Sequence, residues 1–383
     1  MWAPFVPGLR LCRLFYTEAV RPLLHEAYPK LRYAAGRLGE GSEVLGFDTE
    51  RSVDHDWGPR LELFLTPDDL ARHGEEIPAM LTARLPTQVA GWPTHFAPAD
   101  GRTRVLAHTD GPIAHRVRVT ELGAWCDGYL GFDPRHDVGT LDWLATPSQR
   151  LAEVTGGAVF HDGIGELTAL RGRLRWYPDD VWRYLLACQW MRIAEEEPFV
   201  GRTAEAGDEL GSRVLTARLA RDVMRLCLLL GRRYPPYSKW LGSAFGELPE
   251  AAGIGAALGE ALTGDGAGRQ AALCTAYEAV GGWQNRLGLA EPVETTRRPF
   301  HDRPYPVIDA GRFAAALLAR IGDPEIAGLP PVGGIDQYVD STPVLSGVAD
   351  SVRLRREWTR IWACHGSAEA SRDRRPGPAS PVG

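Results

Sequence analysis

Lysine is almost absent from this sequence. Among 383 residues it occurs only at Lys30 and Lys239, so arginine carries nearly all of the positive charge. The formal net charge is −6 at pH 7. A negative balance gives no general attraction for the phosphate backbone of nucleic acids, so we expect no general nucleic-acid binding. Small-molecule substrates are the first expectation.

Cysteine and long apolar runs are scarce as well. The chain has no C-x-x-C pair and no metal-ligand spacing among its six cysteines, which argues against a zinc site or a disulfide framework. No apolar run approaches the length of about 20 residues that crosses a bilayer. Pro and Arg interrupt the first residues too early for a secretory signal. We therefore expect a soluble cytoplasmic protein with no membrane partner.

What the sequence does contain is enough apolar material for more than one core. Its length of 383 residues and its 44% apolar content predict two domains and a tail. The tail, residues 363–383, has too few apolar residues to fold, so we expect it to be disordered.

The most informative stretch runs from Leu31 to Leu65. It reads as a strand over 31–38, a turn rich in Gly and Ser, and a second, alternating strand over 61–65. Gly41 leaves room for a phosphate beside the backbone, and Ser42 adds a hydroxyl at an expected helix start. Chemistry is expected at this turn.

Asp54 and Asp56 precede the second strand. If the backbone there is extended, both carboxylates project from the same face, because side chains alternate along a strand. Mg²⁺ prefers hard oxygen ligands and commonly takes one or two protein carboxylates, with water and phosphate completing its shell. We therefore predict a Mg²⁺ site at Asp54 and Asp56. Asp48 and Glu50 are expected to solvate the loop, and His55, on the opposite face, to be structural.

Gly41-Ser42, Gly46 and the run Ser52-Val53-Asp54-His55-Asp56 together resemble the active-site signature of the polymerase-β-type nucleotidyltransferase superfamily. An isolated D-x-D or Gly-Ser pair is common in loops; the joint spacing between two strand-like runs favours the functional interpretation. The resemblance implies that Gly41 and Ser42 hold a triphosphate and that Asp54 and Asp56 are Mg²⁺ ligands. More broadly, the chain resembles a bacterial domain-of-unknown-function family with such an N-terminal half and a helical C-terminal half.

The same resemblance calls for a third carboxylate on a later strand. The run over 113–120 alternates as a strand but contains no acid. Glu121 follows it directly and is the nearest candidate for the third catalytic acid, and Asp110 is a poorer one. Without a third acid, the protein would be a nucleotide-binding or protein-interaction module that has lost turnover.

The expected fold is α+β: a nucleotidyltransferase-like α/β domain with a small mixed sheet, followed by a mainly helical domain. We place the first domain at 1–135 and the second at 136–362, with a β-hairpin over 159–174 around Asp162-Gly163. Helices are expected over 9–28, with a break at Pro22, and over 121–130 and 146–155. The helical half is expected to contain helices from 178 onward and over 211–230, 251–262, 269–287 and 311–321.

A loop after the 211–230 helix gathers cations and aromatics over 232–240. Tyr237 could contact a nucleotide through its ring or hydroxyl, and Lys239 supplies a point charge for phosphate. The alternative, that the aromatics plug the helical bundle, is about equally supported. Two other segments are set aside: His161-Asp162 precedes a turn and is unlike a metal-binding pair, and Arg297–Pro304 is expected to be a structural brace.

The sequence thus favours a Mg²⁺-dependent nucleotidyltransferase. It would move a nucleoside monophosphate from a nucleoside triphosphate such as ATP to the hydroxyl of a small-molecule or protein acceptor. The nucleotide and the acceptor are not identified by any motif.

Overall fold

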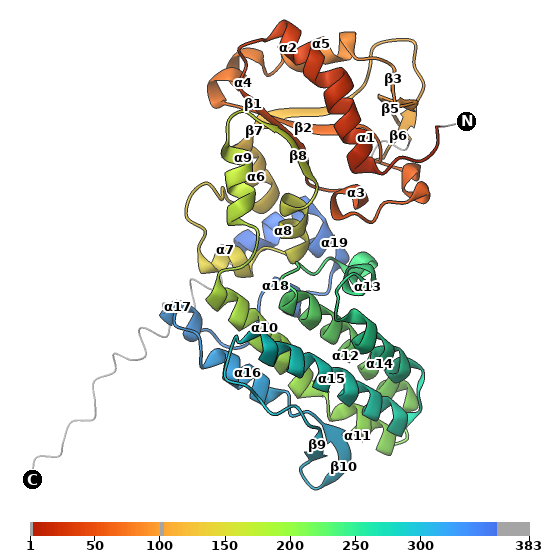
Figure 1. The fold of residues 1–383 in the computed structure, drawn as a ribbon, viewed down its shortest axis with the longest axis vertical. Coiled ribbons are helices and arrows are strands. Elements are labelled where there is room, and N and C mark those ends of the chain that lie inside the picture. The colour runs from red at the N-terminus through yellow and green to blue at the C-terminus, as the bar shows by residue number, and fades with distance from the viewer. Residues whose placement is uncertain (1–2, 100–102, 358–383) are drawn as a thin grey trace, which may run out of the picture.

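The computed structural model describes residues 3–99 and 103–357 and has the expected α+β architecture, with a small mixed sheet in the N-terminal half and helices beyond it (Figure 1). The tail expected over 363–383 lies outside the described residues. Within the described ranges, no helix is both long enough and apolar enough to cross a membrane.

The central sheet has four strands in the order β7-β2-β1-β8. Strand β1 runs antiparallel to both of its neighbours, whereas β2 and β7 are parallel. The strands are β1 (Tyr33–Arg37), β2 (Arg60–Leu65), β7 (Arg116–Glu121) and β8 (Ala158–Asp162). The first three confirm the strands expected from the sequence.

The prediction of a β-hairpin over 159–174 is wrong. Its first arm is β8, which pairs with β1, and its second arm is the helix α9 (Glu166–Arg173). The carboxylate of Asp162 accepts hydrogen bonds from the backbone N–H groups of Gly165 and Thr168, both at 2.8 Å. The Asp-Gly pair therefore begins a helix, and the sheet takes its fourth strand from beyond residue 135, where we expected the first domain to end.

The N-terminal helical segment is continuous through three pieces: α1 (Gly8–Leu14), a π-helical piece η1 (Phe15–Val20) and α2 (Arg21–Ala27). Pro22 has no backbone N–H and so cannot make the α-helical hydrogen bond to the preceding turn. The break expected at Pro22 takes the form of the π-helical piece just before it.

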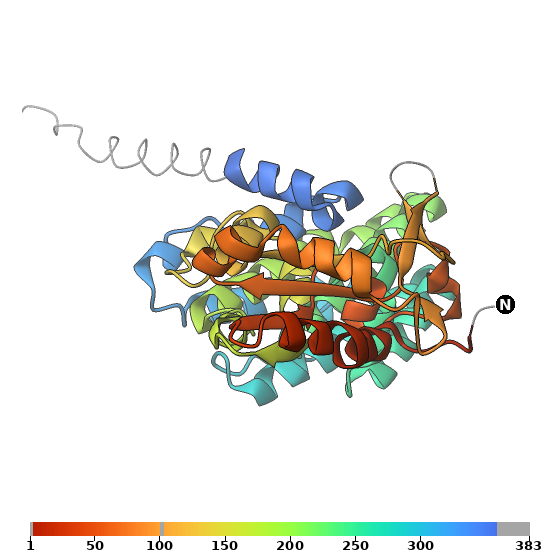
Figure 2. The ribbon, with the colours of Figure 1, turned by 90° about the horizontal axis from the view of Figure 1, so that it is seen from above.

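The two faces of the sheet bury different cores. On one face, Leu61, Leu63 and Leu65 pack with the N-terminal helical segment and with α5 (Glu76–Arg84). Figure 2, seen from above, shows red helices and orange helices on either side of an orange strand. On the other face, Phe64 packs edge-on against Trp125 of α6 (Leu122–Leu130). The polar positions Arg60 and Glu62 share the α6 face, because side chains alternate along β2.

The remaining elements of the N-terminal half are short. The loop expected over 86–111 holds two small hairpins, β3–β4 and β5–β6. These elements are α3 (Ser42–Leu45), the 3₁₀ helix η2 (Glu50–Asp54), α4 (Pro67–His73), β3 (Gln88–Val89), β4 (Trp92–Pro93), β5 (His95–Pro98), β6 (Arg104–Ala107), α7 (Thr140–Leu144) and α8 (Ser148–Thr155).

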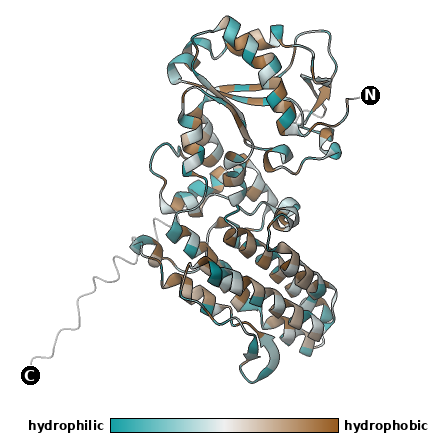
Figure 3. Cartoon of the chain, in the orientation of Figure 1, coloured by the Kyte–Doolittle hydropathy of each residue, from teal (hydrophilic) through white to brown (hydrophobic). Residues whose placement is uncertain are grey.

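The C-terminal half is helical, as expected, and its helices contain many apolar residues, coloured brown in Figure 3. Trp190 of α10 donates to the side-chain oxygen of Gln284 on α15 at 2.6 Å. The principal helices are α10 (Asp179–Glu196), α11 (Phe199–Glu205), α12 (Glu209–Leu230), α13 (Ser238–Gly246), α14 (Ala251–Thr263), α15 (Gly266–Leu287) and α16 (Gly311–Leu318).

Several short elements follow or interrupt these helices. The segment expected to be a brace forms a hairpin, and Arg297 beside it pairs with Glu278 of α15 at 2.8 Å. The elements are β9 (Arg298–Phe300), β10 (Arg303–Val307), α17 (Pro324–Ala327), α18 (Ile335–Tyr338) and α19 (Thr342–Ser346).

The capping role of Asp162 is testable. Asp162→Ala removes the acceptor for two N–H groups at the start of α9, so we expect the free energy of unfolding to fall by about 1 kcal/mol. Urea denaturation measures this change. The control is Asp137→Ala, an exposed carboxylate with no hydrogen bond to the described residues; equal stability losses in the two variants would contradict the cap.

Candidate functional site

A cavity of about 550 Å³ lies between the sheet and the helical half; we call it the first cavity. It brings together six of the seven residues that the sequence analysis selected, although they come from three separate segments. These six are Gly41, Ser42, Asp54, Asp56, Tyr237 and Lys239.

The Gly-Ser turn forms one wall of the first cavity. Gly41 has a φ of +149°, and a Cβ there would lie 2.5 Å from the Glu43 carboxylate and 2.6 Å from the Arg37 guanidinium. Only glycine fits this position without displacing that pair. Ser42 begins α3, and its hydroxyl makes no hydrogen bond within the described part of the chain. Because α3 has four residues, the turn offers local polar groups rather than a helix dipole.

The backbone at the two aspartates differs from the expectation. Asp54 is the last residue of η2, and Asp56 has a φ of +47° in the left-handed region. Strand β2 begins only at Arg60. The sequence analysis placed both carboxylates on one face on the condition that this segment is extended. That condition is not met, because a 3₁₀ turn and a bend replace the extended backbone. Both residues nevertheless line the first cavity.

Each aspartate has a nitrogen-bearing side chain beside it. The Oδ1 of Asp54 lies 2.7 Å from Nδ1 of His55, and both side chains are more than half exposed. Asp56 pairs with the guanidinium of Arg116, which arrives from β7. His55 was expected to point away as a structural residue; it also lines the first cavity. Both carboxylates thus lie at the cavity in contact with a neighbouring side chain.

This donor set suits a hard cation that is shared with a ligand. Across residues 3–99 and 103–357, no group of three or more His, Cys, Asp or Glu side chains is arranged to hold a metal ion. Mg²⁺ does not need one, since it is commonly bound by one or two protein carboxylates with water and phosphate oxygens as the other ligands. Asp54 and Asp56 fit that mode.

Behind the turn lies a buried ion pair network. The Glu43 carboxylate, 2% exposed, receives Arg37 at 2.8 Å and Arg60 at 2.5 Å. Burial alone would raise the pKa of Glu43, but the two guanidinium groups outweigh it and lower the pKa to about 2. Arg37 also donates to the backbone oxygens of Leu38 and Glu40. The network fixes the residues on both sides of Gly41.

The helical side of the first cavity is a second polar cluster. Glu153 of α8 accepts hydrogen bonds from the Tyr129 hydroxyl and from Arg150, each at 2.6 Å. Burial raises the pKa of Glu153, against the opposing effect of Arg150. Glu40, which is exposed, completes this rim, with its carboxylate 3.6 Å from Arg150.

Two roles were considered for the aromatic and cationic loop over 232–240: contact with a nucleotide and packing into the helical bundle. Different residues of the loop fit each role. Tyr234 is buried, and its hydroxyl donates to the backbone oxygen of Leu174 at 2.8 Å, as a plug of the bundle would. Tyr237 and Lys239 instead line the first cavity. The Nζ of Lys239 lies 4.8 Å above the Trp240 ring and makes no ion pair within the described ranges. Its charge is therefore open to a ligand.

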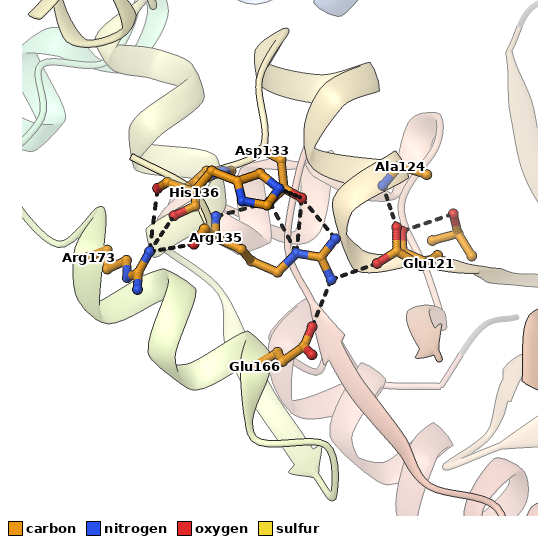
Figure 4. Close-up of polar contacts among 9 residues, drawn as sticks. Glu121, Ala124, Asp133, Arg135, His136, Glu166 and Arg173 are labelled. Atoms are coloured by element: carbon orange, nitrogen blue, oxygen red, sulfur yellow. Dashed lines mark hydrogen bonds and ion pairs between the residues drawn. The ribbon is translucent and has the colours of Figure 1, made fainter. Parts of the chain in front are cut away.

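Glu121 does not belong to this site, which corrects the sequence-based assignment. Its carboxylate caps α6 through the Ala124 N–H at 2.7 Å and pairs with Arg135 at 2.7 Å (Figure 4). Arg116, at the opposite end of β7, is the residue beside the first cavity. Five strand positions separate the two residues, or about 17 Å. Asp110 does not line the first cavity either.

Several lining residues had no role in the sequence analysis. Arg116 lines the first cavity from β7, and its alternation with Arg118, which places two cations on one face of the strand, was the available signal. Glu40 adjoins the Gly-Ser turn, but the residues around it in the sequence form no motif that would identify it as a site residue. Glu153 and Gln149 lie in a predicted helix and reach the cavity only through tertiary packing.

Comparisons with known proteins give limited matches. A family model described as a domain of unknown function (DUF4037) matches residues 143–241, which contain α8 and the Tyr237–Trp240 wall of the first cavity. No curated protein matches the chain. A solved structure of a nucleotidyltransferase-like protein from Exiguobacterium sibiricum aligns with 79% of this chain and 88% of its own, at 13% identity and a TM-score of 0.28.

The Glu43 network makes the stability of the protein depend on acid pH. The folded pKa of about 2 lies below the ordinary value of about 4.3, so the stabilisation is complete above about pH 5 and is lost as the pH falls toward 2. Two pKa units correspond to on the order of 3 kcal/mol. We expect Glu43→Gln to be less stable at pH 7 and to lose less stability between pH 5 and 3 than the unsubstituted protein does.

Urea denaturation at several pH values measures both effects. Glu50→Gln, an exposed acid with no ion pair to the described residues, is the matched control and should follow the unsubstituted protein. A Glu43→Gln variant with an unchanged acid transition would show that the network does not set this pH dependence.

Proposed function

We propose that the protein is a Mg²⁺-dependent nucleotidyltransferase that transfers a nucleoside monophosphate from a nucleoside triphosphate to an acceptor hydroxyl. One observation carries the proposal: a single cavity is lined by the Gly41-Ser42 turn, by Asp54 and Asp56, and by Lys239. The turn offers contacts for phosphate, the two carboxylates suit a hard cation, and the Lys239 ammonium offers positive charge to the triphosphate.

The triphosphate would lie along the Gly-Ser turn. Gly41 has no side chain to obstruct it, and the Ser42 hydroxyl and the Lys239 ammonium are both without a stronger partner among the described residues. Tyr237 supplies a ring and a hydroxyl on the facing wall. These four residues are the proposed nucleotide contacts.

Asp54 and Asp56 would hold Mg²⁺. When bound, the ion would supply positive charge that stabilises the phosphate oxygens and the departing pyrophosphate. Arg116 now neutralises Asp56. Arg116 also lines the first cavity, where its guanidinium would be available to contact a phosphate oxygen if Asp56 held the ion.

The transfer requires an acceptor oxygen and a destination for its proton. The acceptor hydroxyl oxygen forms a bond to the α-phosphorus, and the bond from that phosphorus to the bridging oxygen breaks, with its electron pair leaving on pyrophosphate. Glu40, exposed on the rim of the first cavity, is the carboxylate that we assign to receive the hydroxyl proton. It takes the role that the sequence analysis gave to Glu121.

The alternative is a nucleotide-binding or protein-interaction module without turnover. It is favoured by one observation: β7 delivers Arg116, not a carboxylate, to the first cavity. Calorimetry with ATP and Mg²⁺ and a pyrophosphate assay over a panel of hydroxyl acceptors separate the two, since a module binds nucleotide but releases no pyrophosphate.

The proposed metal ligands give the first functional test. We expect Asp54→Asn/Asp56→Asn to lower pyrophosphate release by about a hundredfold or more, because the charge that stabilises the leaving group is lost. Glu121→Gln removes a carboxylate outside the cavity and should retain transfer. Undiminished release by the double variant, with its fold verified by circular dichroism, would refute the assignment of these ligands.

The chain also offers a matched pair for testing the counter-charge. Lys239→Gln should raise the dissociation constant for ATP with Mg²⁺ roughly fivefold, because an exposed ion pair contributes up to about 1 kcal/mol. Lys30→Gln changes the only other lysine, which lies outside the first cavity, and should leave the affinity unaltered. Isothermal titration calorimetry gives both constants; equal values for the two variants would remove Lys239 from the site.

A further inference from the structure

A second cavity of about 440 Å³ adjoins the first and shares Glu40, Arg60 and Arg116 with it. It lies on the face of β2 and β7 that packs toward α6, with Trp125, Gly128 and Tyr129 as its helical wall. Its lining is strongly cationic. The five arginines that line it are Arg37, Arg60, Arg104, Arg116 and Arg118.

The strand register explains why these charges meet. Gly36 of β1, Glu62 of β2 and Arg118 of β7 are direct partners across the sheet. Side chains two positions apart share a face, so Arg60 and Arg116 extend the same polar surface toward the first cavity.

Three of the lining side chains, those of Glu62, Arg104 and Arg118, make no hydrogen bond or ion pair within the described ranges. The Oε2 of Glu62 is buried and accepts no hydrogen bond within the described ranges. Burial raises the pKa of Glu62, and this outweighs the nearby Arg37 and Arg118. Arg118 is exposed, and its guanidinium makes no hydrogen bond or ion pair to any described residue. A buried acceptor without a partner is costly unless a ligand satisfies it.

Three of the five arginines already have a carboxylate partner. Arg37 and Arg60 pair with Glu43, and Arg116 pairs with Asp56. Among the described residues, Arg104 and Arg118 have no ion pair, so the second cavity presents two unpaired cations and the unsatisfied carboxyl group of Glu62. A ligand that satisfies both kinds of group needs an anionic group and a hydrogen-bonding hydroxyl.

We propose that the second cavity binds the acceptor of the transfer, and that the acceptor is a small molecule with a hydroxyl and a phosphate or carboxylate group. The anion contacts Arg118, one hydroxyl pairs with Glu62, and the reacting hydroxyl reaches the first cavity past Glu40. The acceptor role rests on the proposed function; the binding of a hydroxylated anion does not.

Gly128 allows the site to be blocked without any change of charge. It lies in α6 on the wall of the second cavity, and a Cβ there meets no atom within 4 Å. Gly128→Leu fills this space. The control is Gly172→Leu, the same change at an exposed glycine of α9 with equally open surroundings outside both cavities. Arg118→Gln removes the cation, and its control is Arg320→Gln, an exposed arginine that lines neither cavity.

Calorimetric titrations with glycerol 3-phosphate and with glycerate test the site, and the two probes distinguish phosphate from carboxylate. We expect at least one probe to bind, with roughly ten- to a hundredfold weaker binding in Arg118→Gln and Gly128→Leu, because a charge-assisted hydrogen bond or the space itself is lost. Both controls should bind as the unsubstituted protein does, and uncharged glycerol should not bind. ATP with Mg²⁺ should bind alongside the probe.

Four outcomes decide the matter. No binding of either probe at millimolar concentration overturns the proposal, as does unchanged binding in Gly128→Leu. Competition between ATP and the probe also overturns it, because the second cavity would then belong to the nucleotide. Probe binding that depends on Arg118 and Gly128 and persists in Asp54→Asn/Asp56→Asn supports the anion site. If no pyrophosphate is released in that case, the transferase proposal and the acceptor role fail while the anion site stands.

Discussion

The buried carboxylate of Glu43 is the interaction on which the candidate site depends. It joins β1, β2 and the turn between them, because Arg37 and Arg60 reach it from the two strands. Neither guanidinium makes an ion pair with another described carboxylate, so loss of Glu43 would leave buried positive charge without its partner. Gly41 lies against this pair with no room for a side chain. The shape of the Gly-Ser turn therefore follows from the ion pair beneath it.

Arginines of the ion pairs around Glu43 and Asp56 lie at the boundary between the two cavities. Arg60 lines both of them while it is bound to Glu43, and Arg116 lines both while it is bound to Asp56. Arginine suits this position because its planar group can bind several acceptors at once and stays charged when buried. Among the described residues that line the first cavity, Lys239 is the only lysine.

The predictions from sequence that were wrong concern short polar segments whose residues are compatible with more than one local structure. Asp162-Gly163 was interpreted as a hairpin turn, yet the Asp carboxylate caps a helix. Asp-Gly is favourable in both settings, because Asp can bind nearby N–H groups and Gly tolerates positive φ. Asp54 and Asp56 were likewise expected to share one face if their segment was extended, but η2 and a left-handed residue occupy that segment. Short polar segments do not choose between such states without their tertiary partners.

The sequence by itself determined the local elements: the strands at β1, β2 and β7, the long helices of the second half, and the Gly-Ser and Asp-x-Asp pairs. Those features depend on periodicity and on residue type, which neighbours in the chain settle. Only the tertiary structure decided which residues meet. Parallel pairing of β2 with β7 brings Arg116 to the first cavity and carries Glu121 about 17 Å away. Strand direction and partner choice are long-range, so no pattern around Glu121 could have revealed its distance from the aspartates.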